Sequence, residues 1–291
     1  MTETSQTALA QDLGFQPGEV LRTFGMRRSG NHAIINWLLR NAEGNSTFLN
    51  NCTIGKAATQ SWRAVEVNAK RMPIKRGTPI SDVTAGVGDG ALLVVSYEDF
   101  LPDPDEGGEG LTTDVPMDLI KRDIVLYRHF MNWSASLLRK IQANEDQDTL
   151  VCLRIMMVAL DKYRELLELV SNSANNDFLP INYDRWVARP RYRARILQEL
   201  GLPHKDNSLG SVQPYGGGSS FQKGVKLADK LATDERWREM VNDPAYQLVL
   251  LAASQDRELV ELMQKLMPAD ADMLVAYLDQ AQFPYHVEVA D

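Results

Sequence analysis

Residues 24–38, FGMRRSGNHAIINWL, combine a short apolar lead, a basic turn and the start of an amphipathic helix. Gly25 and Gly30 have the spacing of the phosphate-binding pattern G-x-x-x-x-G-K-[ST]. Asn31 stands where that pattern has its lysine, and His32 stands where it has the hydroxyl that holds Mg²⁺. The segment therefore keeps the turn of a phosphate-binding loop without the groups that ATP chemistry requires.

Two cations, Arg27 and Arg28, precede the second glycine and supply positive charge in place of the lysine. Backbone N–H groups at the turn and the dipole of the following helix also favour an anion. We therefore expect residues 27–32, which include Ser29, to surround a phosphate without a metal ion. A glycine turn with two solvated arginines is the alternative interpretation.

A second basic position follows the apolar run DIVLY, where Tyr127 and Arg128 are followed by Ser136. An arginine fork can bind phosphate oxygens in bidentate fashion, and a hydroxyl two helical turns along can complete the cradle. A solvated cap at a strand end is the alternative for Arg128.

The pattern of apolar residues predicts an α/β fold, with a central parallel sheet flanked by helices on both faces. Residues 1–17 are expected to form a flexible tail and residues 18–291 a single domain. Residues 54–90 show no clear period, and a long connection of this kind is often a substrate loop. The predicted strands are residues 20–24, 91–96, 123–127 and 178–183, and the predicted helices are residues 31–41, 132–142, 148–170, 184–200 and, beyond residue 227, segments broken near 243–244 and 267–268.

The composition limits the classes of function. A formal net charge of −8 disfavours a general nucleic-acid binder, which would carry an excess of Lys and Arg. No signal peptide is recognisable, and nowhere do ~18 apolar residues run together, so we expect a cytoplasmic protein without a membrane span. Cys52 and Cys152 have no metal-binding spacing and are expected to be free, buried thiols.

The loop resembles the 5′-phosphosulfate loop of sulfotransferases that use 3′-phosphoadenosine-5′-phosphosulfate (PAPS). Arg28, Ser29 and Gly30 match the R-S-G form found in many carbohydrate-modifying members, while Asn31 and His32 replace the usual hydroxyl pair. The resemblance implies a P-loop NTPase-like sulfotransferase fold with a helical C-terminal part. It also implies PAPS as the donor, 3′,5′-adenosine bisphosphate as the product and no metal ion.

Three further segments match this family in order and approximate spacing, so that the likeness spans residues 24–221. Arg128 and Ser136 resemble the family's 3′-phosphate site. Residues 181–203 resemble its strand, Y-E-D and helix segment, so Tyr183 takes the adenine contact by resemblance. The family's [TS]-S-F segment, which also holds the adenine, is matched by Ser219, Ser220 and Phe221. The closing R-K-G-x-x-G-D-W segment is absent from the sequence, and Lys223 or Lys226 are candidates for the 3′-phosphate.

The resemblance also suggests roles in sulfuryl transfer. Arg28 is expected to stabilise the sulfuryl and bridging oxygens. His32 can deliver a proton to the leaving group if its pKa lies near neutrality. The family's histidine base is replaced here by residues 96–99, SYED, where Glu98 is the preferred base and Asp99 the second choice. A carboxylate that only caps the next segment is the alternative for both.

The acceptor is expected to be a hydroxyl or amine of a glycan, a lipid or a small metabolite, and the sequence does not decide between these. Residues 54–90 and 102–120 are expected to line its pocket, where Trp62, Arg63 and Lys70 are candidate contacts to a sugar or an anionic acceptor. Two other functions stay open: a P-loop-type small-molecule kinase, and a non-catalytic nucleotide-binding relative of the sulfotransferases. Homodimerisation also stays open.

Overall fold

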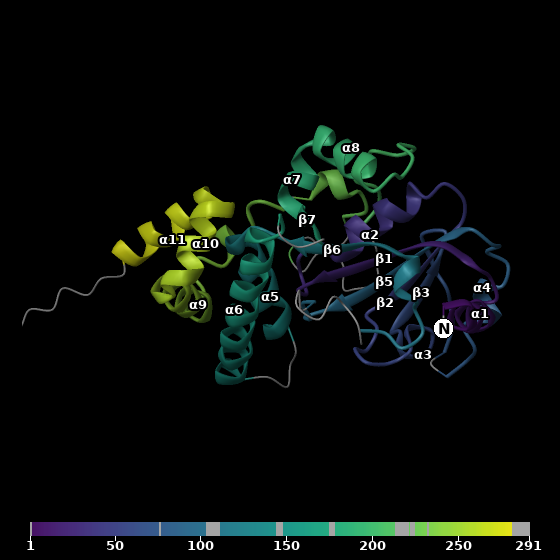
Figure 1. Ribbon diagram of the computed structural model, residues 1–291. Coiled ribbons are helices and arrows are strands. Elements are labelled where there is room, and N and C mark those ends of the chain that lie inside the picture. The colour runs from purple at the N-terminus through teal and green to yellow at the C-terminus, as the bar shows by residue number, and fades with distance from the viewer. Residues whose placement is uncertain are drawn as a thin grey trace, which may run out of the picture. The chain divides into compact units, whose positions relative to one another are not determined.

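A computed structural model describes residues 2–75, 77–102, 111–143, 148–174, 178–212, 221, 225–231 and 233–280 of the chain. The contacts divide the chain into two compact units, where the sequence predicts one domain over residues 18–291. The first unit comprises Met1–Arg128 and Asn172–Thr233, and the second comprises His129–Ser171 and Asp234–Asp291. The helices and strands of the two units are labelled in Figure 1.

The first unit is built on a seven-stranded sheet in the order β4-β3-β2-β5-β1-β6-β7. Strands β2, β5, β1, β6 and β7 are parallel, whereas β3 and β4 pair antiparallel at one edge. The α/β class is thus confirmed, with a sheet that is mostly parallel. The strands are β1 (Pro17–Gly25), β2 (Ser46–Asn50), β3 (Ala64–Val67), β4 (Lys70–Arg71), β5 (Ala91–Glu98), β6 (Ile120–Tyr127) and β7 (Phe178–Asn182).

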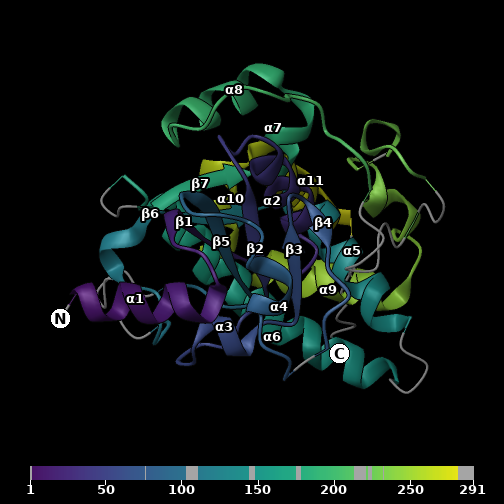
Figure 2. The ribbon, with the colours of Figure 1, turned by 90° about the vertical axis from the view of Figure 1, so that its right-hand side faces the viewer.

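Side chains alternate between two hydrophobic clusters, one on each face of the sheet. In β5, Leu92 and Val94 join one cluster, whereas Leu93 and Val95 join the other. Helices α2, α7 and α8 cover the first face, and α1, α3 and α4 lie on the second (Figure 2). The helices of this unit are α1 (Thr2–Leu13), α2 (Asn31–Arg40), α3 (Ala58–Ser61), α4 (Ser81–Thr84), α7 (Tyr183–Ala188) and α8 (Pro190–Glu199), with short 3₁₀ turns at Met117–Leu119 and Ala228–Lys230.

The N-terminal segment differs from the expected flexible tail, because residues 2–13 form helix α1. Leu9 and Leu13 are fully buried, and Phe15 is buried just after the helix. The Thr84 hydroxyl donates a hydrogen bond to the Leu13 carbonyl. Two leucines at i and i+4 form an apolar stripe too narrow to stand out among polar neighbours, yet it suffices to pack the helix on the sheet.

The helix predicted over residues 184–200 is interrupted. Arg189 has an extended backbone between α7 and α8, and Pro190 is the first residue of α8. Proline lacks an N–H donor and disfavours helical geometry in the residue before it, so the chain turns at this point.

The described residues of the second unit are helical and contain no strand. The expected breaks near residues 243 and 267 are confirmed, since helices begin at Pro244 and Pro268. A stack of Trp133 on Tyr163, with ring centroids 4.2 Å apart, lies in the core of this unit. Its helices are α5 (Phe130–Gln142), α6 (Thr149–Ser171), α9 (Pro244–Gln255), α10 (Arg257–Leu266) and α11 (Pro268–Gln280), with a 3₁₀ turn at Arg236–Glu239.

Candidate active site at the carboxyl edge of the sheet

The order of the strands creates a topological switch point beside β1. From β1 the chain leads to β2 on one side of the sheet, whereas from β6 it leads to β7 on the other. Ligands of open α/β sheets bind outside the carboxyl ends of the strands at such a point. In the register, Gly25 lies opposite Glu98 of β5 and opposite Leu126 of β6, and Tyr127 lies opposite Asn182. The carboxyl ends of β1, β5, β6 and β7, which carry the candidate residues of the sequence, therefore lie at the same edge of the sheet.

The loop of residues 26–30 joins β1 to α2 in an unusual backbone conformation. Arg28 has a φ of 72° and Gly30, the N-cap of α2, has a φ of 88°. Left-handed backbone at a non-glycine residue is strained and concentrates at functional sites. Gly30 supplies no capping side chain, so the first N–H groups of α2 stay available to an anion.

Two polar atoms in and beside this loop are buried without a hydrogen-bond partner among the described residues: Ser29 Oγ and Asn31 Oδ1. The amide nitrogen of Asn31 donates to the Met26 carbonyl at 3.3 Å and so closes the loop on itself. Buried polar atoms normally find partners, and exceptions are typical of sites that bind an ion or a ligand. Asn31, which stands where the phosphate-binding pattern has its lysine, thus stabilises the loop.

Arg128 connects the loop to the elements around it. Its guanidinium donates to the carbonyls of Arg28, at 3.3 Å, and of Thr233. It lies 3.9 Å from the Asp184 carboxylate and 5.1 Å from the centre of the Tyr183 ring. Arg128 is 1% exposed, so this strand-end arginine is a buried junction and not a solvated cap.

The two residues expected to bind one 3′-phosphate belong to different units. Arg128 ends a segment of the first unit, and Ser136 is a residue of α5 in the second. The Ser136 hydroxyl is buried and accepts a hydrogen bond from Arg236 Nη1 at 3.3 Å. Tyr183 is buried at the start of α7, where its ring stacks on Trp186.

Arg27 and Asp99 form an ion pair beside the loop. The Asp99 carboxylate accepts hydrogen bonds from the backbone N–H of Arg27, at 2.8 Å, and from its guanidinium. Asp99 itself has a φ of 57°, and its N–H donates to the Gly25 carbonyl. The side chain that the sequence offers as the second choice of base is therefore engaged in holding the loop.

Glu98 and His32 face one another across the start of α2, with Oε1 and Nε2 3.9 Å apart. Burial raises the pKa of Glu98, and the neighbouring Asp99 adds to this, against the opposing effect of nearby arginines. A carboxylate with a raised pKa is a stronger base. The other Glu98 oxygen accepts a hydrogen bond from Asn51 Nδ2 at 3.3 Å. Glu98 is thus both held in place and made more basic.

His32 does not meet the condition for the proton-delivery role expected from the sequence. Burial, with Arg28 and Arg71 nearby, lowers its pKa to about 4. The ring is therefore neutral at pH 7 and carries no extra proton for a leaving group. Its place beside Glu98 makes it a neutral neighbour of the candidate base.

Arg28 lies near a second guanidinium group, that of Arg128. Burial and the neighbouring Arg128 lower its pKa, and Glu98 and Tyr183 act in the opposite direction. Two guanidinium groups near each other in a partly buried place repel, and a bound anion relieves that repulsion. The charge distribution thus agrees with the anion-binding role expected for residues 27–32.

Sequence reasoning missed Asn51, which holds the Glu98 carboxylate. Asn51 follows β2 with a φ of 51°, and its N–H donates to Ser96 Oγ. The only signal was an asparagine pair at the end of an unrecognised strand. Ser219, Ser220 and Lys223 lie outside the described residues, Phe221 is half-buried in the first unit, and the Lys226 carbonyl accepts from Val212 N–H.

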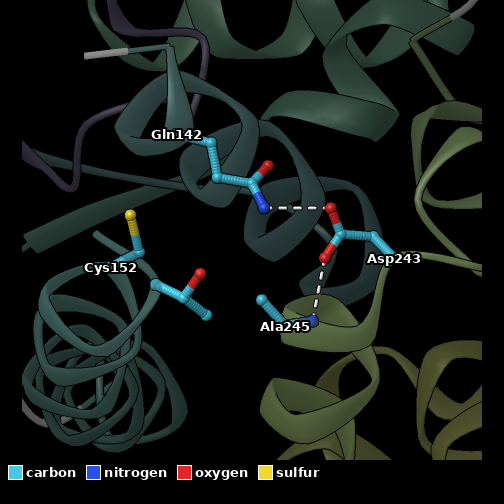
Figure 3. A pocket seen from close by; sticks show the side chains of 5 residues that line it. Gln142, Cys152, Asp243 and Ala245 are labelled. Carbon is cyan, nitrogen blue, oxygen red and sulfur yellow. Dashed lines mark hydrogen bonds between the residues drawn. The ribbon is translucent and has the colours of Figure 1, made fainter. Parts of the chain in front are cut away.

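Elsewhere, a pocket of about 250 Å³ lies in the second unit between α5, α6 and the start of α9 (Figure 3). Its main polar group, Asp243, is the N-cap of α9, accepts from the N–H of Ala245 and also accepts from Gln142 Nε2. This carboxylate is satisfied by the protein itself. Cys52 and Cys152 are free and buried, as expected.

Over the described ranges, no cluster of three or more His, Cys, Asp or Glu is arranged to hold a metal ion. Within the same residues, every helix is too short or too polar to span a membrane. Comparison of the chain with protein-family models, with curated proteins and with solved structures finds no match.

Proposed function

We propose that the protein is a PAPS-dependent sulfotransferase with a P-loop NTPase-like fold, which transfers a sulfuryl group to a hydroxyl or amine of its acceptor. One observation carries the proposal: the loop of residues 26–30 presents Arg28, the uncapped start of α2 and the buried Ser29 hydroxyl beside Glu98 at the switch point. An anion site with a carboxylate base next to it suits the transfer of a charged group to a neutral nucleophile.

In the proposed reaction, Glu98 accepts the proton of the acceptor as its oxygen or nitrogen attacks the sulfur. Arg28 and the first N–H groups of α2 stabilise the charge that grows on the 5′-phosphate oxygen as its bond to sulfur breaks. Removing one such donor typically costs ~10²–10³ in rate. His32, neutral at pH 7, shields the Glu98 carboxylate without taking a proton.

The nucleotide contacts follow the resemblance in the sequence. Tyr183, Ser219, Ser220 and Phe221 are proposed to hold the adenine, and Arg128 the 3′-phosphate. The Arg128 guanidinium donates to two carbonyls in this structure. It can bind the 3′-phosphate only if phosphate oxygens replace at least one of these carbonyls.

Specific observations bear on the two other functions. A kinase needs a lysine and a Mg²⁺-binding hydroxyl at positions 31 and 32. Here Asn31 donates a hydrogen bond to the Met26 carbonyl, and His32 faces Glu98. A non-catalytic nucleotide-binding relative is favoured by His32, which replaces a hydroxyl of the phosphate-binding pattern and is neutral at pH 7.

A thermal-shift titration tests the donor. 3′,5′-Adenosine bisphosphate at ~100 Kd should stabilise the protein by ~2.7 kcal/mol, and ATP with Mg²⁺ should stabilise it far less. Arg28→Ala should weaken bisphosphate binding by ~10–100-fold, since a hydrogen bond to a charged group contributes ~1.5–3 kcal/mol. Arg191→Ala, which removes an exposed arginine on α8, is the matched control and should leave binding unchanged.

The three functions give different results in this experiment. Preference for ATP with Mg²⁺, followed by phosphoryl transfer, would establish a kinase. Bisphosphate binding without release of bisphosphate from PAPS, across hydroxyl and amine acceptors, would establish the non-catalytic relative. Failure of the bisphosphate to bind at all would overturn the proposal.

A further inference from the structure

Helices α7 and α8 concentrate arginine on the outside of the first unit (Figure 1, Figure 2). Residues 185–198 contain five arginines and no acid, although the chain as a whole has a net charge of −8. Arg193 is buried and donates to backbone carbonyls of the same unit. The exposed arginines are Arg185, Arg189, Arg191 and Arg195. Their positive charge is therefore a local feature of this surface.

Two of these arginines, Arg185 and Arg195, are held around one tyrosine. Asn182, the last residue of the edge strand β7, accepts a hydrogen bond at Oδ1 from the Arg185 N–H, at 2.8 Å. The N–H of Asn182 donates to the Tyr192 hydroxyl at 3.1 Å. The guanidinium carbon of Arg195 lies 5.4 Å from the centre of the Tyr192 ring. The start of α7 and the middle of α8 thus place both arginines next to Tyr192.

The electrostatics of Tyr192 agree with this geometry. Burial raises the pKa of its hydroxyl, whereas the N–H of Asn182 and the guanidinium groups of Arg185 and Arg195 lower it. Because the effect of a charge falls with distance, both cations lie within reach of the hydroxyl.

No carboxylate neutralises the two cations. Over the residues that the structure describes, the guanidinium groups of Arg185 and Arg195 make no ion pair or hydrogen bond. Asp184, next to Arg185 in the chain, instead lies 3.9 Å from Arg128. Glu199, one turn after Arg195, raises the pKa of Tyr192. The Tyr192 hydroxyl accepts one hydrogen bond and, within the same described part of the chain, donates none.

The available donors define the chemistry of a ligand. Two guanidinium forks and one O–H group can serve an anion with three terminal oxygens, and their two positive charges match a dianion. A phosphate monoester has three such oxygens and a charge of about −1.5 to −2 at pH 7. A sulfate ester carries one charge, and a carboxylate has one charge and two oxygens. The phosphate monoester is therefore the best match.

We propose that Arg185, Arg195 and the Tyr192 hydroxyl form a binding site for a phosphate monoester on the outer side of α7 and α8. The inference goes beyond the proposed function and does not depend on it. Both a soluble metabolite and a lipid headgroup can present this group, and the experiment separates the two sources.

Calorimetric titration with phenyl phosphate, phenyl sulfate and benzoate tests the site, because these probes share a ring and differ in the anion. Phenyl phosphate should bind most tightly. The double variant R185A/R195A should lose at least about tenfold in affinity for it, since each arginine donates to a charged group. Tyr192→Phe, which keeps the ring, should lose about tenfold, and Glu199→Gln should gain about twofold.

R189A/R191A is the matched control, because it removes the same charge from exposed arginines of the same segment. It should change affinity less than about threefold. Arg28→Ala should bind phenyl phosphate as the wild type does, which separates this site from the loop of residues 26–30. Thermal unfolding of each variant checks that the fold is kept.

Vesicles of phosphatidylcholine, with and without phosphatidic acid, distinguish the two sources. Sedimentation with the phosphatidic acid vesicles that R185A/R195A abolishes would assign the site to a lipid headgroup. Binding of phenyl phosphate without sedimentation would assign it to a soluble phosphate monoester.

Equal affinity for the three probes, an equal loss in R189A/R191A, or binding that Arg28→Ala removes and R185A/R195A keeps would overturn the site. Failure of the proposed function is a separate result, since it shows as a lack of binding of 3′,5′-adenosine bisphosphate.

Discussion

The Tyr183 ring lies directly against Gly30: a Cβ built on that glycine would overlap Tyr183 Cδ2. Gly30 also has a φ of 88°, which L side chains rarely adopt. The start of α7 therefore packs closely on the loop before α2. A side chain at residue 30 would force the Tyr183 ring or the loop to move. Under the proposed function, this contact would link the anion-binding loop to the residue proposed to hold the adenine.

Gly30→Ala should destabilise the protein by about 2–4 kcal/mol. About 1–2 kcal/mol comes from the left-handed backbone and the rest from the overlap with Tyr183. Chemical denaturation measures the change. In a Tyr183→Ala background, Gly30→Ala should cost only the backbone part, because the overlap is absent. Gly44→Ala, at a site with no atom within 4 Å, is the control and should be close to neutral.

Arg128→Ala distinguishes a 3′-phosphate ligand from an arginine that only positions the loop. If Arg128 binds the 3′-phosphate, the variant should bind 3′,5′-adenosine bisphosphate more weakly and 5′-AMP unchanged. The variant should also lose about 1–3 kcal/mol of stability, because the carbonyls of Arg28 and Thr233 lose their donor. Equal weakening of both nucleotides would show that Arg128 acts through the loop conformation alone.

Arg193→Ala is the matched control for Arg128. Arg193 is a buried arginine of the first unit that donates to the carbonyls of Trp186 and Val187, away from the loop. Its loss should lower stability without changing the ratio of the two nucleotide affinities. A changed ratio in this variant would trace the effect of Arg128→Ala to general loosening of the unit.

His32 should make the stability of the protein fall on mild acidification. Its pKa is about 4 in the folded protein and near 6.5 in the unfolded chain, so the unfolded chain binds more protons between these values. The contribution of the neutral ring is complete above pH 6.5 and is lost as the pH falls toward 4. It amounts to about 2 kcal/mol between pH 7 and pH 5.

The measurement is the free energy of unfolding of wild type and His32→Gln at pH 7 and pH 5. The variant should lose less stability than wild type over this interval. Glu98 acts in the opposite direction, since its raised pKa favours the folded protein at low pH, but it is present in both proteins. His204→Gln, at an exposed position, controls for the loss of a histidine, and identical pH profiles for wild type and H32Q would contradict the prediction.

The sequence predicted the centre of the sheet and missed one edge, for a physical reason. Strands β1, β5 and β6 are buried on both faces over most of their length, and short apolar runs of this kind are recognisable as strands by their length and composition. Strand β2, STFLN, is also buried, but Ser46 and Thr47 fill core positions and resemble a turn. The edge strands β3 and β4 have four and two residues, which is too short to show a period.

The candidate site shows the same division. The loop of residues 26–30 was found because glycines and cations in a fixed spacing are a local signal. The contacts of Arg128 with the carbonyls of Arg28 and Thr233 join segments about a hundred residues apart, which spacing cannot reveal. The pKa of His32 is lowered first by burial and then by Arg28 and Arg71, and the pairing of β4 with β3 that brings Arg71 near is likewise not visible in the spacing.

The adjacent carboxylates Glu98 and Asp99 should respond differently to neutral substitution. Glu98→Gln should lower sulfuryl transfer by ~10²–10⁴, the usual contribution of a general base, and leave bisphosphate affinity within about threefold. Asp99→Asn should weaken bisphosphate binding, because Asp99 holds the loop through the N–H and guanidinium of Arg27.

Turnover of PAPS under single-turnover conditions, measured beside bisphosphate affinity, separates the two roles. Each variant keeps the size of the original side chain, so the comparison isolates the negative charge. If E98Q keeps its rate while D99N loses it at unchanged affinity, Asp99 is the base and Glu98 a structural neighbour of His32. The hydrogen bond from Asn51 to Glu98 supports the first outcome, since it orients one carboxylate oxygen and leaves the other toward the start of α2.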